Sequence, residues 1–288
     1  MKVLLFATHP IQYYAPIYRE LSRKVDLTVV YFIKSTEQMQ AKAGFDVEFA
    51  WDLPLLEGYK FEFAENRART PSSASYFGVI ANNIPALMKK HNPDKVIVQG
   101  WFPYGMIQVL RYCRRHKIET LSRGDSTLFM RVPIWKKWVK YIYIKWVLGM
   151  IDKLLLVGEQ NKKFFQHYQT PESKFFYARH CINTPHFIKE FQEAERVDTN
   201  LFRIGFSGKL IDKKRPLDLV EAVGLSKHKE SIELIIMGSG PLEGAVLSRM
   251  EELQIKHRYL GFVNQSKLVS DGYSIMDVLV LPSGQNET

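Results

Sequence analysis

The chain of 288 residues is 46% hydrophobic and 24% charged and carries a net charge of +10, which is typical of a globular protein with an anionic partner. Its length allows two domains. No uncharged stretch is as long as a membrane helix, and the opening MKVLLFATHP is too short for a signal-peptide core. Cys113 and Cys181 show neither a pairing pattern nor metal-ligand spacing, so we expect a cytoplasmic protein.

Strand-like and helix-like stretches alternate along the chain. We expect strands at 3–7, 27–32, 95–99, 118–121 and 153–157, and helices at 74–90 and 104–116. After a polar stretch at 190–200, we expect strands at 203–207, 233–237 and 277–281, and helices at 217–223 and 242–253. This order predicts an α/β fold of two Rossmann-like domains, residues 1–195 and 196–288, each with a doubly wound parallel sheet.

Positive charge is concentrated in residues 131–163, which contain eight Lys or Arg, two acidic residues, three Trp and two Tyr. Apolar residues occupy most of the circumference of the helix expected there, which favours a covering helix whose lysines reach outward. The alternative is docking on an anionic membrane surface, where Trp and Lys suit the interface. The charge alone does not choose among phosphate, lipid and nucleic acid.

A second basic region lies in RIGFSGKLIDKKRPLDLVEAV, where a strand ends at Ser207 and Gly208 and a helix begins near Pro216. The loop between them carries four cations: Lys209, Lys213, Lys214 and Arg215. Cations around a helix N-terminus suit a diphosphate, because free backbone N–H groups and a positive dipole end converge there. A solvated basic loop is the alternative.

The next loop, ELIIMGSGPLEG, is again a strand, a glycine turn and a helix. Gly238, Ser239 and Gly240 allow a ligand to approach the backbone closely, although such turns also serve tight packing. Two phosphate-suited loops on consecutive strands of one sheet open on the same edge, which favours a binding site.

Several segments resemble a known family. GKLIDKKRPLDLVEAV, LIIMGSGPLEG, YLGFVNQSKL and DVLVLPSGQNET, in this order, are similar to the second domain of retaining glycosyltransferases of family 4, which have the GT-B architecture. HPIQYYAPIYREL and LSRGDS resemble the first domain of one branch of that family. The resemblance implies transfer of a sugar from a UDP- or GDP-linked donor with retention, without a metal or other cofactor. The chain contains no Asp-x-Asp, the pattern by which other glycosyltransferases hold a divalent cation.

The resemblance also implies residue roles in the second domain. An Arg and a Lys five residues later hold the donor diphosphate in the family, and the matching positions here are Lys209 and Lys214. Lys keeps the charge but loses the bidentate fork of Arg. Glu287 matches a glutamate that contacts the transferred sugar, and the donor base is expected near three further residues, Gly261, Phe262 and Val263.

The family continues with a second glutamate that would fall beyond Thr288. We therefore expect a C-terminally truncated fragment whose second domain lacks strands. Such a fragment would have little transferase activity and exposed apolar surface near Val278, Val280 and Leu281.

Candidate residues of the first domain follow two expected strands. His9, Gln12 and Tyr13 come after the first strand, on the usual ligand side of such sheets, or else form a turn that caps a helix. Arg123 and Asp125 of LSRGDS face the same side, or else pair with each other.

The predicted function is a glycosyltransferase that acts on a saccharide or lipid-linked acceptor in polysaccharide or glycolipid synthesis, with peripheral contact at the inner face of an anionic membrane. The alternative is a non-catalytic basic protein that binds membrane or nucleic acid. Against nucleic acid, the aromatic residues cluster on an apolar helix and form no exposed stacking platform. Nucleic acid is therefore not an expected partner.

Overall fold

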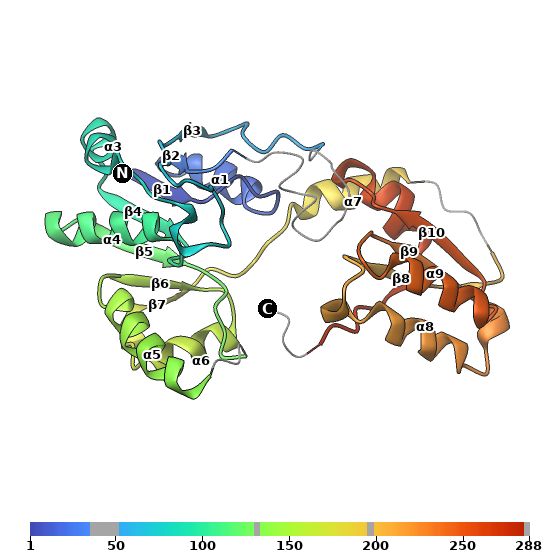
Figure 1. Cartoon of the computed structure of the whole chain (residues 1–288). Helices are drawn as coiled ribbons and strands as arrows, with labels where there is room; N and C mark the ends of the chain where they lie inside the picture. Colours follow the sequence, from blue (N-terminus) through green and yellow to red (C-terminus); the bar gives the residue numbers. More distant parts are fainter. Residues whose placement is uncertain (35–51, 130–132, 195–198, 285–288) are drawn as a thin grey trace. The chain divides into compact units, whose positions relative to one another are not determined.

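The computed structural model describes residues 1–34, 52–129, 133–194 and 199–284 (Figure 1). Its contacts divide these residues into two compact units. The first unit lies within Met1–Lys34 and Leu55–Ile182, and the second lies within Asn183–Glu287 together with Ser35–Pro54. Each unit contains one parallel β-sheet, which confirms the predicted α/β fold with two parallel-sheet units.

The first unit has a seven-stranded sheet in the order β3-β2-β1-β4-β5-β6-β7. Its strands are β1 (Lys2–Ala7), β2 (Asp26–Tyr31), β3 (Lys60–Phe63), β4 (Lys95–Gln99), β5 (Glu119–Arg123), β6 (Lys153–Leu156) and β7 (Phe175–Tyr177). Its helical segments are α1 (Ala15–Ser22), η2 (Tyr76–Gly78), α3 (Ile84–His91), α4 (Tyr104–His116), α5 (Ile134–Leu148), α6 (Glu159–His167) and η3 (Glu172–Lys174).

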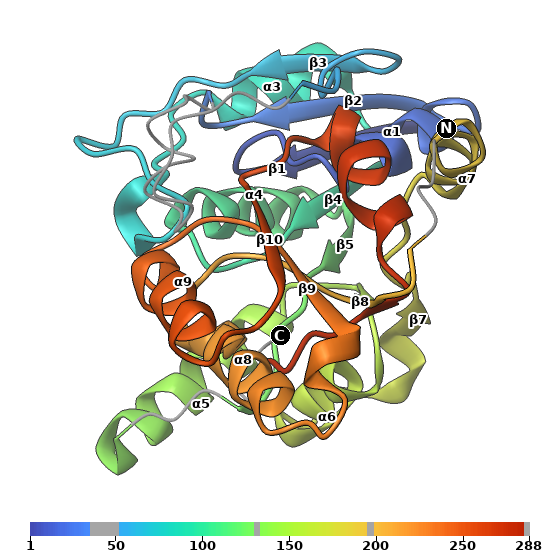
Figure 2. The same cartoon turned by 90° about the vertical axis from the view of Figure 1, so that its right-hand side faces the viewer.

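The second unit has a four-stranded sheet in the order β10-β9-β8-β11. Its strands are β8 (Phe202–Ser207), β9 (Ile232–Met237), β10 (His257–Gly261) and β11 (Val278–Leu279). Its helical segments are α7 (Thr184–Glu193), η4 (Asp212–Lys214), α8 (Pro216–Gly224), η5 (Lys229–Ser231), α9 (Glu243–Glu252), η6 (Gln265–Lys267), η7 (Leu268–Gly272) and η8 (Tyr273–Ile275). Helices α8 and α9 lie side by side (Figure 2).

The strand order predicts which edge of each sheet would bind a ligand, and we call it the ligand edge. In the first sheet the chain builds outward from β1 in both directions, so the order switches between β1 and β4. In the second sheet it builds outward from β8, and the switch falls between β8 and β11. Ligands of open parallel sheets bind beside the carboxyl ends of the strands at such a switch point.

The helix predicted over 74–90 is wrong in its first half. The structure has the short η2 turn and then extended backbone at Val79, and α3 begins only at Ile84. Pro85 explains the late start, because proline lacks an N–H group and suits the first helical turn better than a helix interior.

The strand predicted over 277–281 is shorter in the structure, and the exposed apolar surface expected there is present at Val278 and Leu281, whereas Val280 is partly buried. Only Val278 and Leu279 pair with β8, and both side chains are exposed. Among the strands that the structure describes, β11 has a single neighbour, so it is an edge strand with one unpaired side.

Candidate active site

Three loops of the second unit are joined by backbone hydrogen bonds at the carboxyl ends of β8, β9 and β10. The amide of Gly208 donates to the Met237 carbonyl at 2.9 Å, and the amide of Gly238 donates to the Gly261 carbonyl at 2.7 Å. The amide of Leu210 donates to the Ser239 carbonyl at 2.9 Å, and Ser239 itself is buried. The three predicted donor loops therefore form one continuous backbone surface.

Gly238 and Gly240 are required by close packing between two of these loops. Gly238 has a φ of +142°, and a Cβ there would lie 1.9 Å from the Gly208 carbonyl oxygen. Gly240 has a φ of +152°, and its Cβ would lie 2.7 Å from the Leu210 carbonyl oxygen. Packing therefore accounts for both glycines, and a role in approaching a donor stays a prediction.

Lys209 and Lys214 lie on the same loop, between β8 and α8. Both side chains are partly buried, and the pKa of Lys209 is lowered, first by burial and then by the positive charge of Lys214. Lys213, by contrast, is exposed, and Arg215 forms an ion pair with Asp218. Two like charges held in partial burial at a helix N-terminus suit a small anion.

The loop after β11 reaches the same lysine loop. The Val280 amide donates to the Gly205 carbonyl at 2.8 Å, and the Gly284 amide donates to the Lys213 carbonyl at 2.9 Å. This contact lies at the switch point between β8 and β11. Glu287 lies outside the described residues, so its predicted sugar contact stays a prediction.

The residues after β10 are only partly buried. Gly261 has a φ of +64°, and a Cβ there would meet nothing within 4 Å. Val263 packs against a small apolar cluster that includes Met237, and Phe262 is likewise partly exposed. These residues border the glycine loops, and their contact with a base stays a prediction.

In the first unit, His9, Gln12 and Tyr13 form the turn between β1 and α1, beside the switch point. His9 accepts or donates a 2.9 Å hydrogen bond with Thr8, and burial lowers its pKa. Tyr13 is exposed, and burial of part of its ring raises its pKa. The helix begins after Tyr14, whose side chain makes no capping hydrogen bond.

Arg123, at the end of β5, is buried among aromatic rings. Its Nε donates to the Ala178 carbonyl at 3.1 Å, its Nη2 lies 3.5 Å from His180 Nδ1, and its guanidinium sits 5.3 Å from the centre of the Tyr14 ring. Asp125 is exposed. The structure thus gives Arg123 partners other than Asp125.

His180 and Tyr18 are site residues that the sequence did not predict. The His180 ring lies 6.0 Å from the Tyr13 ring, and its pKa is lowered, first by burial and then by Arg123. His180 follows β7 by three residues. Ligands bind beside the carboxyl ends of parallel strands, so His180 could have been predicted as a site residue if this short strand had been recognised in the sequence.

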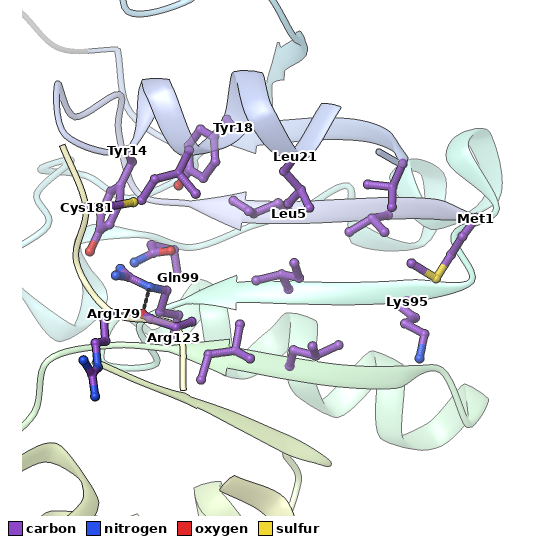
Figure 3. A pocket seen from close by; sticks show the side chains of 17 residues that line it. Met1, Leu5, Tyr14, Tyr18, Leu21, Lys95, Gln99, Arg123, Arg179 and Cys181 are labelled. Carbon is purple, nitrogen blue, oxygen red and sulfur yellow. Dashed lines mark hydrogen bonds between the residues drawn. The ribbon is translucent and has the colours of Figure 1, made fainter. Parts of the chain in front are cut away.

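A cavity of about 350 Å³ lies against β1, β4 and β5 in the first unit (Figure 3). Its walls are almost entirely apolar, with Tyr14, Arg123 and Arg179 at one end and Met1 and Lys95 at the other. Two buried polar atoms on its wall, Tyr18 Oη and Arg123 Nη1, have no hydrogen-bond partner within the part of the chain that the structure describes.

Residues 187–288 match the family described as glycosyl transferases group 1. No curated protein matches. Among solved structures, HepE (Alr3699) of Anabaena in complex with UDP and glucose is similar with a TM-score of 0.61 at 9% identity, covering 98% of this chain and 74% of that chain. The apo lipopolysaccharide outer core galactosyltransferase WaaB gives 0.58 at 14% identity, covering 98% and 74%.

The UDP-GlcNAc 2-epimerase of Neisseria meningitidis, bound to UDP-GlcNAc, gives a TM-score of 0.56 at 14% identity and covers 99% of this chain and 78% of that chain. Likeness at such identities shows the fold, which hosts both transferases and epimerases. The fold is GT-B, and residues 187–288 carry the match to glycosyl transferases group 1, which together support a glycosyltransferase.

Proposed function

We propose that the protein transfers a sugar from a nucleotide-sugar donor to an acceptor. One observation carries the proposal: the loop from β8 to α8 holds the partly buried Lys209 and Lys214, and hydrogen bonds on both sides of Lys209 join this loop to the glycine turn that follows β9. The family match over residues 187–288 and the UDP complexes of HepE support a nucleotide-sugar donor.

The reaction breaks the bond between the sugar and the diphosphate, so negative charge develops on the leaving diphosphate. The ammonium groups of Lys209 and Lys214 and the positive end of the α8 dipole would stabilise that charge electrostatically. We propose that these groups act without a metal ion. Glu287 would hold the transferred sugar, and the residues Gly208, Gly238 to Gly240 and Gly261 to Val263 would contact the UDP- or GDP-linked donor.

We further propose a retaining, family 4 enzyme that transfers a hexose in polysaccharide or glycolipid synthesis. His9, Gln12, Tyr13, Arg123 and Asp125 would contact the acceptor side, because they follow strands of the first sheet at its carboxyl edge. The acceptor would be a saccharide or a lipid-linked saccharide, met in the cytoplasm at the inner face of a membrane.

Titration calorimetry with UDP and GDP tests the diphosphate site. We expect Lys209→Ala and Lys214→Ala each to weaken binding by roughly 2–5 kcal/mol, because each leaves a desolvated phosphate charge unpaired. Lys213→Ala is the matched control, since this neighbouring lysine is exposed, and its effect should be small. Equal, small losses at all three positions would instead indicate a solvated basic loop.

Epimerisation is the competing chemistry, because an epimerase shares this fold. The family match of residues 187–288 favours transfer. Incubation with UDP-GlcNAc, with and without a saccharide acceptor, separates the two activities, because NMR detects an epimer of equal mass and mass spectrometry detects a glycosylated acceptor. Formation of an epimer of the nucleotide sugar would overturn the proposed transfer, whereas a glycosylated product that needs both donor and acceptor would support it.

A further inference from the structure

Helix α5 exposes a continuous row of large apolar side chains. Trp138, Val139, Ile142 and Trp146 are 73%, 68%, 66% and 45% exposed. Three of them are spaced by four residues, so they lie along one side of the helix, and we call the four residues the aromatic ridge. The opposite side of α5 is buried through Ile144, Val147 and Leu148. The helix therefore covers the domain with one face only.

The apolar surface continues beyond α5 onto the loops at the carboxyl edge of the sheet. Tyr143, next to the ridge, hydrogen-bonds through its hydroxyl to the Tyr76 hydroxyl at 3.1 Å. The Tyr76 ring in turn lies 4.9 Å from the Phe77 ring and 6.0 Å from the Phe102 ring, and both of these rings are largely exposed. Phe102 stands three residues after the end of β4, so this surface borders the ligand edge of the first sheet.

Charge on the helix complements an anionic surface. Its sequence, IWKKWVKYIYIKWVL, contains no acidic residue. Lys137 and Lys145 are exposed and Lys140 is partly exposed. By helical spacing Lys145, three residues after Ile142, borders the ridge, and its Nζ donates to Gln169 Oε1 at 2.7 Å. Lysines beside tryptophans suit the headgroup level of a bilayer, where the rings enter the interface and the ammonium groups meet lipid phosphates.

We propose that the aromatic ridge of α5 docks on the surface of a bilayer that contains anionic lipids, with α5 lying in the plane of the interface. A second copy of the chain suits this surface less well, because self-pairing of the ridge would bring together the lysines of both copies. Figure 2 shows α5 extending away from the rest of the first unit. Docking would hold the ligand edge near the headgroups, where a lipid-linked acceptor lies.

This docking surface extends the membrane contact in the proposed function, yet vesicle binding is measured without any sugar transfer, so the two can fail separately. The test is co-sedimentation of the whole chain with phosphatidylcholine vesicles, with and without phosphatidylglycerol. We expect binding only to the anionic vesicles. Trp138→Ser combined with Ile142→Ser should lower the partition coefficient by about tenfold or more. Leu225→Ser, which removes another highly exposed apolar side chain, is the control and should change nothing.

A second pair of variants tests the charge. Lys137→Gln and Lys145→Gln should each weaken binding to anionic vesicles by about fivefold, since a lysine near such a surface contributes about 1 kcal/mol. Equal binding by the ridge variant and the parent chain would overturn the proposal. A second outcome would also overturn it: the parent chain does not bind vesicles and forms dimers in light scattering, and the ridge variant forms none. Circular dichroism of each variant confirms that the fold is intact.

Discussion

The carboxyl edges of the two sheets are built in different ways. In the second unit, three loops hydrogen-bond through their backbones, and glycines permit the contact of Gly238 with the Gly208 carbonyl. In the first unit, side chains make the edge: Arg123 lies among Tyr14 and His180. A backbone-built edge depends on a few glycines at set positions, whereas a side-chain edge depends on residues far apart in the sequence. The predictions below test this difference, beginning with the largest effect.

The backbone-built edge should be the more sensitive to a single methyl group. Gly238→Ala places a Cβ on the Gly208 carbonyl oxygen and forces alanine into a glycine-only conformation, so we expect a loss of roughly 3 kcal/mol in the stability of the second unit. Gly244→Ala is the control, because a Cβ there meets nothing within 4 Å in helix α9. It should be neutral or stabilise the helix by about 1 kcal/mol or less.

Native-state hydrogen exchange measures this effect for each unit separately, which a single melting curve cannot do. Amides of β8 and β9 should lose protection in Gly238→Ala, while amides of β1 and β4 keep theirs. Unchanged protection in both units would show that the loops can move apart, contrary to the tight packing described above.

The lysine pair should make donor binding depend on pH. Burial and Lys214 lower the pKa of Lys209, so Lys209 loses its proton below the ordinary range of lysine. Diphosphate binding favours the charged form, and affinity for UDP should therefore fall as pH rises through that lowered pKa. We expect a fall of about tenfold to a hundredfold, because a hydrogen bond to a charged group contributes roughly 1.5–3 kcal/mol.

Lys209→Arg sharpens this prediction, since arginine keeps its charge throughout. Calorimetry of both proteins across the same pH range cancels the titration of the nucleotide itself. Parallel pH profiles for the two proteins would mean that Lys209 does not contact the diphosphate.

In the first unit, removal of a hydroxyl group that has no hydrogen-bond partner should change the stability only slightly. Tyr18 Oη is buried without a hydrogen-bond partner among the described residues, so Tyr18→Phe should be neutral or stabilise the first unit by about 1 kcal/mol. Tyr31→Phe is the matched comparison, because Tyr31 Oη shares a 2.8 Å hydrogen bond with Tyr59 Oη. It should destabilise by about 1 kcal/mol. Urea unfolding, monitored by hydrogen exchange of the β1 and β2 amides, measures the stability of both variants. Equal losses of stability would contradict the conclusion that Tyr18 Oη has no hydrogen-bond partner among the described residues.

Local pattern determined much of this protein. The strand predicted over 95–99 is β4, and the helix predicted over 104–116 is α4, because alternation of apolar residues and helical spacing are properties of neighbouring residues. The same holds for the lysine loop, whose strand, cations and Pro216 follow one another in the chain. The glycine turn could be predicted from the sequence. The reason why its glycines cannot be replaced could not, because the carbonyl oxygens that a Cβ would meet belong to another loop.

Tertiary structure decided the rest. The partners of Arg123 come from residues 178–180, after β7, a strand of three residues that shows too short a pattern to be recognised. The exposed ridge of α5 could not be predicted either, since apolar residues surround most of that helix and only its packing determines which face is buried. Contacts between residues distant in sequence thus determine which face of α5 is buried and which residues contact Arg123. Burial is a property of the assembled sheet and helices rather than of any single segment.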